Sequence, residues 1–219
     1  MPIDDTKQKL IEAAGKMFAE KGFDAASVRE ICADAGANIA AINYHFGDKR
    51  RLYVESIKFV HACRGDIPRD VTGTTPEQKL KEFIRTLLSN MLDPNRPKWH
   101  WQLFMRELSA PTEACREVVE AFIRPTAHYL REIIGELLPQ EMEEIDRIMM
   151  CFSIVGQCLY YSAYRPIAES LIGADLYETL TIDRLTDHIT RFSLAAIKNG
   201  AAPAIAAFPM AESRTGGAS

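Results

Sequence analysis

The side chains best suited to contact another macromolecule gather in one short stretch, residues 38–45. An Asn carboxamide can form a paired hydrogen bond with the edge of adenine, and a small or aliphatic side chain can contact the methyl group of thymine. Such contacts require a short helix that projects from a compact support into the major groove. The outward-facing residues that we predict on this helix are Asn38, Ile39, Ala40, Asn43, Tyr44 and His45.

Three consecutive cations, Lys49, Arg50 and Arg51, follow at the predicted start of the next helix. Positive side chains at a helix N-terminus oppose the helix macrodipole, so stability alone favours acids there. A phosphate group can be bound jointly by the N-terminal N–H groups and these basic side chains. We therefore predict a phosphate contact, first of all for Lys49; the alternative is a solvated basic face.

Three short helices are predicted to carry these residues. Ser27-Val28-Arg29-Glu30 has the pattern of a capping box, which starts a helix that ends at Gly36. The next helix follows after a tight turn, and this arrangement is typical of a helix-turn-helix. The packing that supports it is expected to join Ile31, Ile42 and Phe46 to Leu10, Met17 and Phe18.

The segment Gly36 to Lys49, G-A-N-I-A-A-I-N-Y-H-F-G-D-K, resembles the helix-turn-helix signature of the TetR/AcrR family. The resemblance covers residues 5–55 and implies phosphate contacts for Tyr44, His45 and Lys49. It also implies that residues 38–40 and Asn43 approach base edges. The complete predicted DNA-binding set is Ser27, Arg29, Asn38, Ile39, Ala40, Asn43, Tyr44, His45 and Lys49.

A second resemblance, to the C-terminal domain of the CecR branch of this family, lies further along the chain. It rests on Trp99, Arg106-Glu107, Pro111-Thr112 and Ile123-Arg124-Pro125. Because ligand-binding domains of the family diverge widely, this resemblance implies little about the effector.

The charge distribution is compatible with DNA binding without being evidence for it. The 219 residues carry a net charge of −4; residues 1–60 hold nine basic and nine acidic side chains, and the remainder hold 17 and 21. No stretch reaches the ~18 uninterrupted apolar residues that a membrane span needs. The polar N-terminus is not a secretory signal, so we expect a cytoplasmic protein without membrane contact.

The motifs of several other functions are missing. The sequence contains no GxSxG, Walker loop, HExxH or paired-carboxylate arrangement, so we expect neither an enzyme nor a cofactor. His61 and Cys63 offer two metal ligands, but a closed zinc site needs four. Cys151 and Cys158 lie two turns apart, about 10 Å along a helix, too far for a disulfide within that helix. A redox- or metal-responsive regulator and a ligand-independent, architectural DNA-binding protein remain as alternatives.

The chain beyond residue 48 is also predicted to be helical. Strand patterns are nearly absent, which predicts an all-α fold of about nine helices. The expected bounds are 5–21, 28–35, 39–46, 49–63, 76–92, 99–108, 112–138 with a kink at Pro125, 141–164 ending before Pro166, and 182–199. We divide the chain into a DNA-binding domain (1–48), an effector-binding and dimerisation domain (49–199) and a disordered tail (200–219).

The helix 141–164 is apolar on most of its surface, so it must be buried on most sides. By the resemblance, TetR-like proteins dimerise through their last two long helices; the alternative is that these faces fill the core of one chain. The predicted interface residues are Phe152, Val155, Gly156, Leu159, Leu185, Ile189 and Phe192.

Aromatic residues with a few polar ends suit a pocket for an apolar small molecule, although most aromatic residues at helical spacing are core. The predicted pocket residues are Trp99, Trp101, Phe104, Met105, Phe122, His128, Tyr129, Gln157, Tyr160 and Tyr161. Together these features predict a dimeric regulator that binds a pseudo-palindromic double-stranded operator and is released by a small hydrophobic effector.

Overall fold

The computed structural model describes residues 5–63, 75–112, 115–138 and 143–199, and every regular element in these ranges is helical. The predicted all-α fold class is confirmed. None of the described helices is both long enough and apolar enough to cross a membrane. The loop predicted over Gly65–Thr75, apart from Thr75 itself, and the tail predicted over 200–219 lie outside the described residues.

Four helices form the N-terminal part of the molecule, which we call the head. They are α1 (Asp5–Lys21), α2 (Val28–Ala35), α3 (Ile39–Phe46) and α4 (Lys49–Ala62). The predicted capping box is present at the start of α2: Ser27 Oγ accepts from the Arg29 N–H at 3.2 Å, and the Glu30 carboxylate accepts from the Ser27 N–H at 3.3 Å. Gly36 ends α2 at φ +63°, a left-handed conformation that glycine adopts without strain.

The remaining helices form what we call the body. They are α5 (Pro76–Leu92), α6 (Lys98–Ser109), α7 (Cys115–Val118), the π-helical turn η1 (Val119–Ile123), α8 (Arg124–Leu137), α9 (Glu144–Ala163), α10 (Arg165–Ile172), α11 (Ala174–Glu178) and α12 (Ile182–Asn199). Pro76 lies in the first turn of α5 as predicted, behind a capping box formed by Thr75 and Gln78.

Two helices of the body, α10 and α11, are absent from the prediction of about nine. With α7, η1 and α8 counted as one continuous helix, the described residues hold eleven helices. Pro166 predicts a helix end, and α9 does end at Ala163, but the same proline lies in the first turn of α10. A proline is tolerated there because its missing N–H would have no partner within the helix.

A π-helical turn, Val119–Ile123, lies directly before Pro125, where the sequence predicts a kink. The Arg124 N–H donates to the carbonyl of Val119, five residues earlier, instead of four as in an α-helix. Proline at 125 cannot donate to the carbonyl of Ala121, and its ring would clash with that carbonyl in a regular α-helix. The wider π turn is one of the known ways in which a helix accommodates such a local break.

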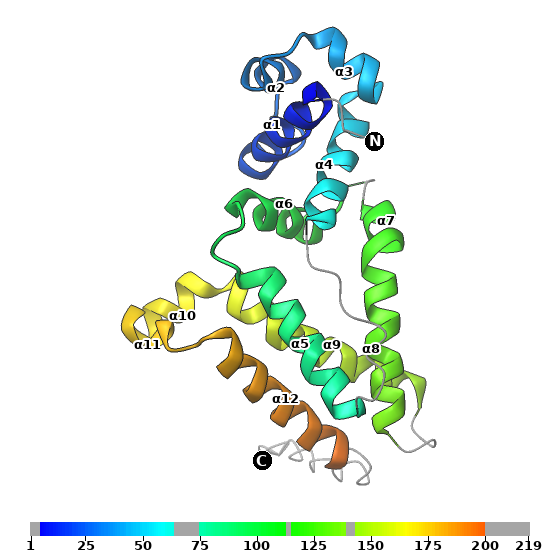
Figure 1. Cartoon of the computed structure of the whole chain (residues 1–219), viewed down its shortest axis with the longest axis vertical. Helices are drawn as coiled ribbons and strands as arrows, with labels where there is room; N and C mark the ends of the chain where they lie inside the picture. The colour runs from blue at the N-terminus through cyan, green and yellow to red at the C-terminus, as the bar shows by residue number, and fades with distance from the viewer. Residues whose placement is uncertain (1–4, 64–74, 113–114, 139–142, 200–219) are drawn as a thin grey trace, which may run out of the picture.

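Two separate hydrophobic cores hold the molecule together. The first core contains side chains from α1, α2, α3, α4, α6 and α7, and the second contains side chains from α5, α8, α9 and α12. Helix α6 therefore belongs to the body in sequence but packs with the head. In Figure 1 it lies between the head and the four helices of the second core.

A close contact between α1 and α6 explains a glycine in the interior of α1. A Cβ atom added to Gly15 would lie 2.1 Å from Cζ3 of the Trp99 ring, so no side chain fits there. Glycine in a helix interior costs roughly 0.5–1 kcal/mol relative to alanine. The cost is offset by the close approach of α6, which fixes the head to the body.

Candidate DNA-binding interface

Helix α3 presents the predicted base-reading residues to solvent. The side of α3 that carries Ile42 and Phe46 is buried in the first core, which orients the opposite side outward. Ile39 is 42% exposed and Tyr44 is 84% exposed, unusual values for large apolar or aromatic side chains on a folded protein. Ala40 and Asn43 are exposed beside them.

Asn38 has a structural task that the sequence pattern did not assign to it. Its side-chain Oδ1 accepts a hydrogen bond from the backbone N–H of Ala40 at 3.1 Å, which makes Asn38 the N-cap of α3. The side-chain amino group is not used in this bond. Asn38 therefore fixes the start of the helix while it keeps two N–H donors for another molecule.

The start of α2 borders the same surface. Ser27 is committed to its capping box, whereas the side chain of Arg29 is exposed. A shallow cleft of about 490 Å³ lies between α2 and α3. Its lining residues are Arg29, Cys32, Ala33, Ala37, Asn38 and Ile39.

Lys49 is held inside the head rather than extended into solvent. Its Nζ donates to the backbone carbonyl of Asp24 at 3.3 Å and lies 4.7 Å from the centre of the Phe23 ring. Asp48 caps α4 by accepting from the Arg51 N–H at 2.7 Å. The Asp48 carboxylate thus offsets the unfavourable interaction predicted between the three cations and the macrodipole of α4. Lys49 links α4 to the connection between α1 and α2.

His45 is half-buried, unlike its neighbours on α3. Its ring centre lies 4.9 Å from that of Tyr44 and 6.0 Å from that of Phe46. The imidazole is therefore positioned by two aromatic rings, one exposed and one in the core. This packing holds the His45 ring at the edge of the exposed side of α3.

A buried hydrogen-bond network joins α4 to α6. The Tyr53 hydroxyl donates to Glu107 Oε2 at 2.5 Å, and both side chains are buried. Glu107 Oε1 also accepts from the backbone N–H of Thr112 at 2.9 Å and from the Thr112 hydroxyl at 3.0 Å. Burial first, and then the adjacent Glu107, raises the pKa of Tyr53 far above its ordinary value, so the phenol stays protonated and able to donate.

The neighbouring Arg106 fixes the other end of the head. Its Nε and Nη2 donate to the backbone carbonyls of Ala19 and Glu20 at 3.3 and 3.2 Å, in the last turn of α1. A cation there satisfies otherwise unpaired carbonyls and complements the macrodipole. We call Tyr53, Arg106, Glu107 and Thr112 the junction. The second resemblance includes Arg106-Glu107 and Thr112, but their spacing gave no sign of this contact with the head.

The predicted pocket residues are divided between the two cores and the surface. Trp99, Trp101, Phe104 and Phe122 pack in the first core, and Tyr129 and Tyr161 pack against the second. Three others lie apart from both groups: His128 is exposed beside Glu132, Tyr160 is exposed, and Gln157 donates to the Ser153 carbonyl within its own helix. The ten side chains therefore do not face one common cavity. Met105 is half-buried on α6.

The predicted dimer residues are also divided. Phe152 is 70% exposed, Phe192 is 58% exposed, and a Cβ atom on Gly156 would meet nothing within 4 Å. Val155 and Leu159 are half-buried. Leu185 and Ile189, in contrast, are buried in the second core, so the interface prediction for these two residues is corrected to the core of one chain.

Exposed apolar residues missed by the prediction lie on the same helix as Phe152. They are Ile145, Met149 and Tyr160 on α9. Together with Phe152 and Gly156 they recur every three or four residues along the solvent side of the helix, while Cys151, Ile154 and Cys158 face the core. An apolar heptad-like stripe could have identified them in the sequence, but periodicity alone does not tell which of two apolar sides is covered.

Comparison with known proteins identifies the family. The model for the C-terminal domain of the HTH-type transcriptional dual regulator CecR matches residues 76–197, more than half of the chain. The model for bacterial regulatory proteins of the tetR family matches residues 10–55.

The chain belongs to the TetR family. CecR of Shigella flexneri, an HTH-type transcriptional dual regulator, is 28% identical over 174 residues, which cover 72% of this chain and 76% of that protein. The HTH-type transcriptional repressor AcnR of Corynebacterium efficiens is 35% identical over 95 residues, covering 43% and 45%. The crystal structure of a TetR-like transcriptional regulator from Rhodococcus sp. RHA1 has the same fold, with a TM-score of 0.61 and 16% identity over 90% of this chain and 98% of that one.

This TetR-family chain is therefore a DNA-binding transcriptional regulator with a helix-turn-helix and a CecR-type body. The relatives are regulators and not enzymes, as the missing catalytic motifs predict. Cys151 and Cys158 are buried, and burial raises their thiol pKa values to about 11 and about 12. Buried, protonated thiols react slowly, which disfavours the redox-sensing alternative for this pair.

His61 and Cys63, the two possible metal ligands in the sequence, lie at the C-terminal end of α4. The residues that the structure describes contain no group of three or more His, Cys, Asp or Glu side chains placed to hold a metal ion. Cys63 is exposed, while the His61 ring is stacked on Phe122 with ring centres 3.8 Å apart. The stacked imidazole contributes to packing between α4 and η1.

Proposed function

We propose that this regulator is a repressor that binds a pseudo-palindromic operator as a homodimer and leaves it when a small hydrophobic effector binds the body. The observation that carries the proposal is the exposed side of α3 on a head that the junction attaches to α6. A relative named as a repressor, AcnR, and one named as a dual regulator, CecR, agree with a role in repression. Binding to chromosomal DNA would place its action in the bacterial cytoplasm.

The contacts with DNA follow from the geometry of α3 and α4. Ile39, Ala40 and Asn43 enter the major groove and contact base edges, because they are exposed on one side of a short helix. Tyr44, at the outer edge of this side, reaches a phosphate. Lys49, whose Nζ donates to the Asp24 carbonyl, adds positive charge near the N-terminus of α4, where the N–H groups of the helix favour a phosphate.

The dimer is formed through the exposed apolar stripe of α9 together with Phe192 of α12. A two-fold axis would pair this surface with itself, as in most homodimers. Exposed Phe152, Met149 and Phe192 would then be buried, and large aromatic side chains are typical of the centre of an interface. The open space around Gly156 allows a helix of the partner to approach closely.

The effector acts through the junction. A small displacement of α6 is transmitted to α4 by the Tyr53–Glu107 bond and to α1 by Arg106. The two DNA half-sites of a dimeric helix-turn-helix protein lie about 34 Å apart. A change of a few ångströms in the distance between the two α3 helices of the dimer therefore prevents them from binding both half-sites at once. Polar atoms that a ligand could satisfy are present in the body: Arg147 Nε and Ser193 Oγ are buried without a hydrogen-bond partner among the described residues.

An operator titration tests the effector. The operator is first selected from a random DNA pool, and compounds that bind the protein are found by calorimetry. A saturating effector should lower operator affinity about 5- to 150-fold, the range of ordinary allosteric couplings. Unchanged operator affinity with every compound that binds the body would favour the architectural alternative.

Light scattering at micromolar concentration tests the dimer. Wild-type protein should have the mass of two chains, and Phe152→Glu should have the mass of one, because a charge is buried at the centre of the interface. Tyr44→Glu is a matched control, since Tyr44 is also an exposed aromatic residue but lies in the head. A monomeric wild-type protein would contradict both the dimer and the palindromic operator.

A further inference from the structure

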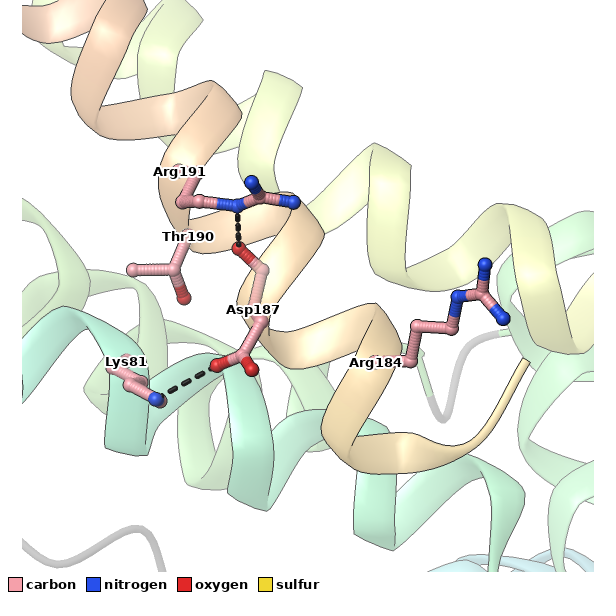
Figure 2. A pocket seen from close by; sticks show the side chains of 5 residues that line it. All are labelled: Lys81, Arg184, Asp187, Thr190 and Arg191. Carbon is pink, nitrogen blue, oxygen red and sulfur yellow. Dashed lines mark hydrogen bonds and ion pairs between the residues drawn. The ribbon is translucent and has the colours of Figure 1, made fainter. Parts of the chain in front are cut away.

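A second cleft lies on the body, between α5 and α12 (Figure 2). It encloses about 550 Å³, a volume within the usual range for small-molecule sites. Its lining residues are Lys81, Arg184, Asp187, Thr190 and Arg191. Three of these five side chains are cations and one is an acid, so the lining is positive although the whole chain carries a net charge of −4.

The acid of the cleft is already paired. Asp187 accepts from Lys81 Nζ at 2.7 Å, and this pair lowers the pKa of Asp187. One turn away, Asp183 is paired with Arg85 of α5 in the same manner. These two pairs join α5 to α12 and account for both carboxylates of α12 on this side.

The two arginines have weaker partners. Arg191 donates through Nε to the backbone carbonyl of Asp187 at 3.3 Å, and Arg184 donates to the Thr179 hydroxyl at 3.3 Å. No ion pair within the described residues joins either guanidinium group to a carboxylate. Both side chains are exposed, seven residues or about 10 Å apart along α12, so their remaining N–H donors are available to a ligand.

Thr190 supplies an independent indication of a ligand. The residue is 6% exposed, and its hydroxyl oxygen is buried without a hydrogen-bond partner among the described residues. Figure 2 shows this hydroxyl pointing toward the ion pair between Lys81 of α5 and Asp187 of α12. Buried hydroxyl groups in proteins are nearly always hydrogen-bonded, so an unpartnered one at the wall of a cleft indicates that something outside the chain can bond to it.

We propose that the cleft between α5 and α12 binds a small molecule through an oxyanion group, either a phosphate or a carboxylate. The anion oxygens accept from the Arg191 guanidinium group and the Thr190 hydroxyl, and the exposed Arg184 side chain, which points away from both in Figure 2, turns toward the anion when it binds. Planar guanidinium groups suit both anions because each can donate two parallel N–H bonds. Lys81 keeps the Asp187 carboxylate paired, so that this acid does not repel the ligand. The site lies on the body, away from the DNA-binding surface, and it does not depend on the proposed function.

Calorimetry with inorganic phosphate and with succinate tests the proposal on the full-length protein, at constant ionic strength set by chloride. Wild-type protein should bind at least one of the two with a Kd of about 1 mM or lower. The probe that binds more tightly identifies the class of anion. The double variant R184Q/R191Q should weaken binding at least tenfold, and Thr190→Val, which keeps the side-chain volume, about threefold.

Arg116→Gln is the matched control, because it removes an equally exposed positive charge from α7, outside the cleft. It should leave the affinity unchanged within about twofold. Thermal unfolding of each variant, followed by circular dichroism, checks that the fold is intact. The proposal is overturned if neither probe binds wild-type protein at about 10 mM, if R184Q/R191Q binds as tightly as wild type, or if Arg116→Gln loses as much affinity as the double variant. Unchanged affinity of Thr190→Val for the anion would contradict a hydrogen bond from the Thr190 hydroxyl to the ligand.

Discussion

The head and the body of this regulator differ in how far apart their candidate functional residues lie along the chain. In the head, the predicted base-reading residues occupy one helix and its N-cap, residues 38–44, and all of them are exposed together. In the body, the predicted pocket and interface residues are spread over four long helices, and packing separates them into two cores and a surface. A site within one helix follows from helical geometry, whereas a site between helices depends on which faces meet.

The division into two cores also differs from the division along the sequence. The first core includes α6, so the head is completed by a helix that follows it by more than thirty residues. The junction residues Arg106 and Glu107 make hydrogen bonds across this boundary. The head is therefore not independent of the body, and variants at the boundary should reveal this most clearly.

The largest effect is expected from Glu107→Ala. The substitution leaves the buried Tyr53 hydroxyl without its acceptor and removes the hydrogen bonds of Glu107 to Thr112, which should cost about 3 kcal/mol of unfolding free energy. Urea unfolding measures the loss, and fluorescence reports the first core because both tryptophans, Trp99 and Trp101, lie on α6. Glu178→Ala, at an exposed glutamate of α11 that makes no ion pair among the described residues, is the control and should change stability by less than about 0.5 kcal/mol. Equal stability of Glu107→Ala and wild type would mean that head and body are independent.

A smaller effect, confined to DNA recognition, is expected from Asn43→Ala. Loss of a paired hydrogen bond to one base should remove about 2 kcal/mol of discrimination at that position. Lys49→Ala is the comparison: it should weaken binding to all sequences about equally and reduce the salt slope by about 1. Binding to a set of operators with single base changes, at several salt concentrations, separates the two outcomes. If both variants lose only non-specific affinity, Asn43 does not read bases.

Ionisation of the Cys158 thiol should destabilise the second core by about 2 kcal/mol between pH 8 and pH 10. Burial raises the pKa of Cys158 to about 12 and that of Cys151 to about 11, above the ordinary value of about 8.5 for an unfolded chain. A raised pKa in the folded state stabilises the fold below the unfolded pKa, and this contribution decreases as the pH rises above it. Unfolding free energies at several pH values should fall less steeply for Cys158→Ala than for wild type. An identical slope in the two proteins would show that this thiol does not titrate with unfolding.

The smallest effect is expected from Gly15→Ala, which tests the contact between α1 and α6. Alanine is the better helix former by roughly 0.5–1 kcal/mol, but its Cβ overlaps the Trp99 ring. Overpacking costs typically 1–3 kcal/mol, so the net loss should be about 1 kcal/mol. The double variant Gly15→Ala/Trp99→Leu should recover part of the loss relative to Trp99→Leu alone, as a double-mutant cycle measures. A stabilised single variant would mean that the two helices can separate without cost.

The sequence by itself determined the local features of this protein. The capping box at Ser27 and the glycine at 36 fix the bounds of α2. The first bonds backbone N–H groups at the start of the helix, and the second allows the left-handed turn that ends it. The spacing of Ile42 and Phe46 likewise decides which side of α3 is exposed. In a short helix with strong caps and one apolar side, the sequence determines both the ends of the helix and the side that is exposed. The family signature lies in this part of the chain.

Only the tertiary structure decided the functional surfaces of the body. Leu185 and Phe192 have the same apolar character in the sequence, yet the first is buried in the second core and the second is exposed. Both lie on α12, and which of them faces solvent depends on where α5 and α9 pack against that helix. Glu107 lies in a helix whose sequence shows no partner for it, and its acceptor role arises because α4 brings Tyr53 beside it from 54 positions earlier. Contacts of such long range leave no periodicity in the sequence, since each side chain meets its partner through the packing of whole helices.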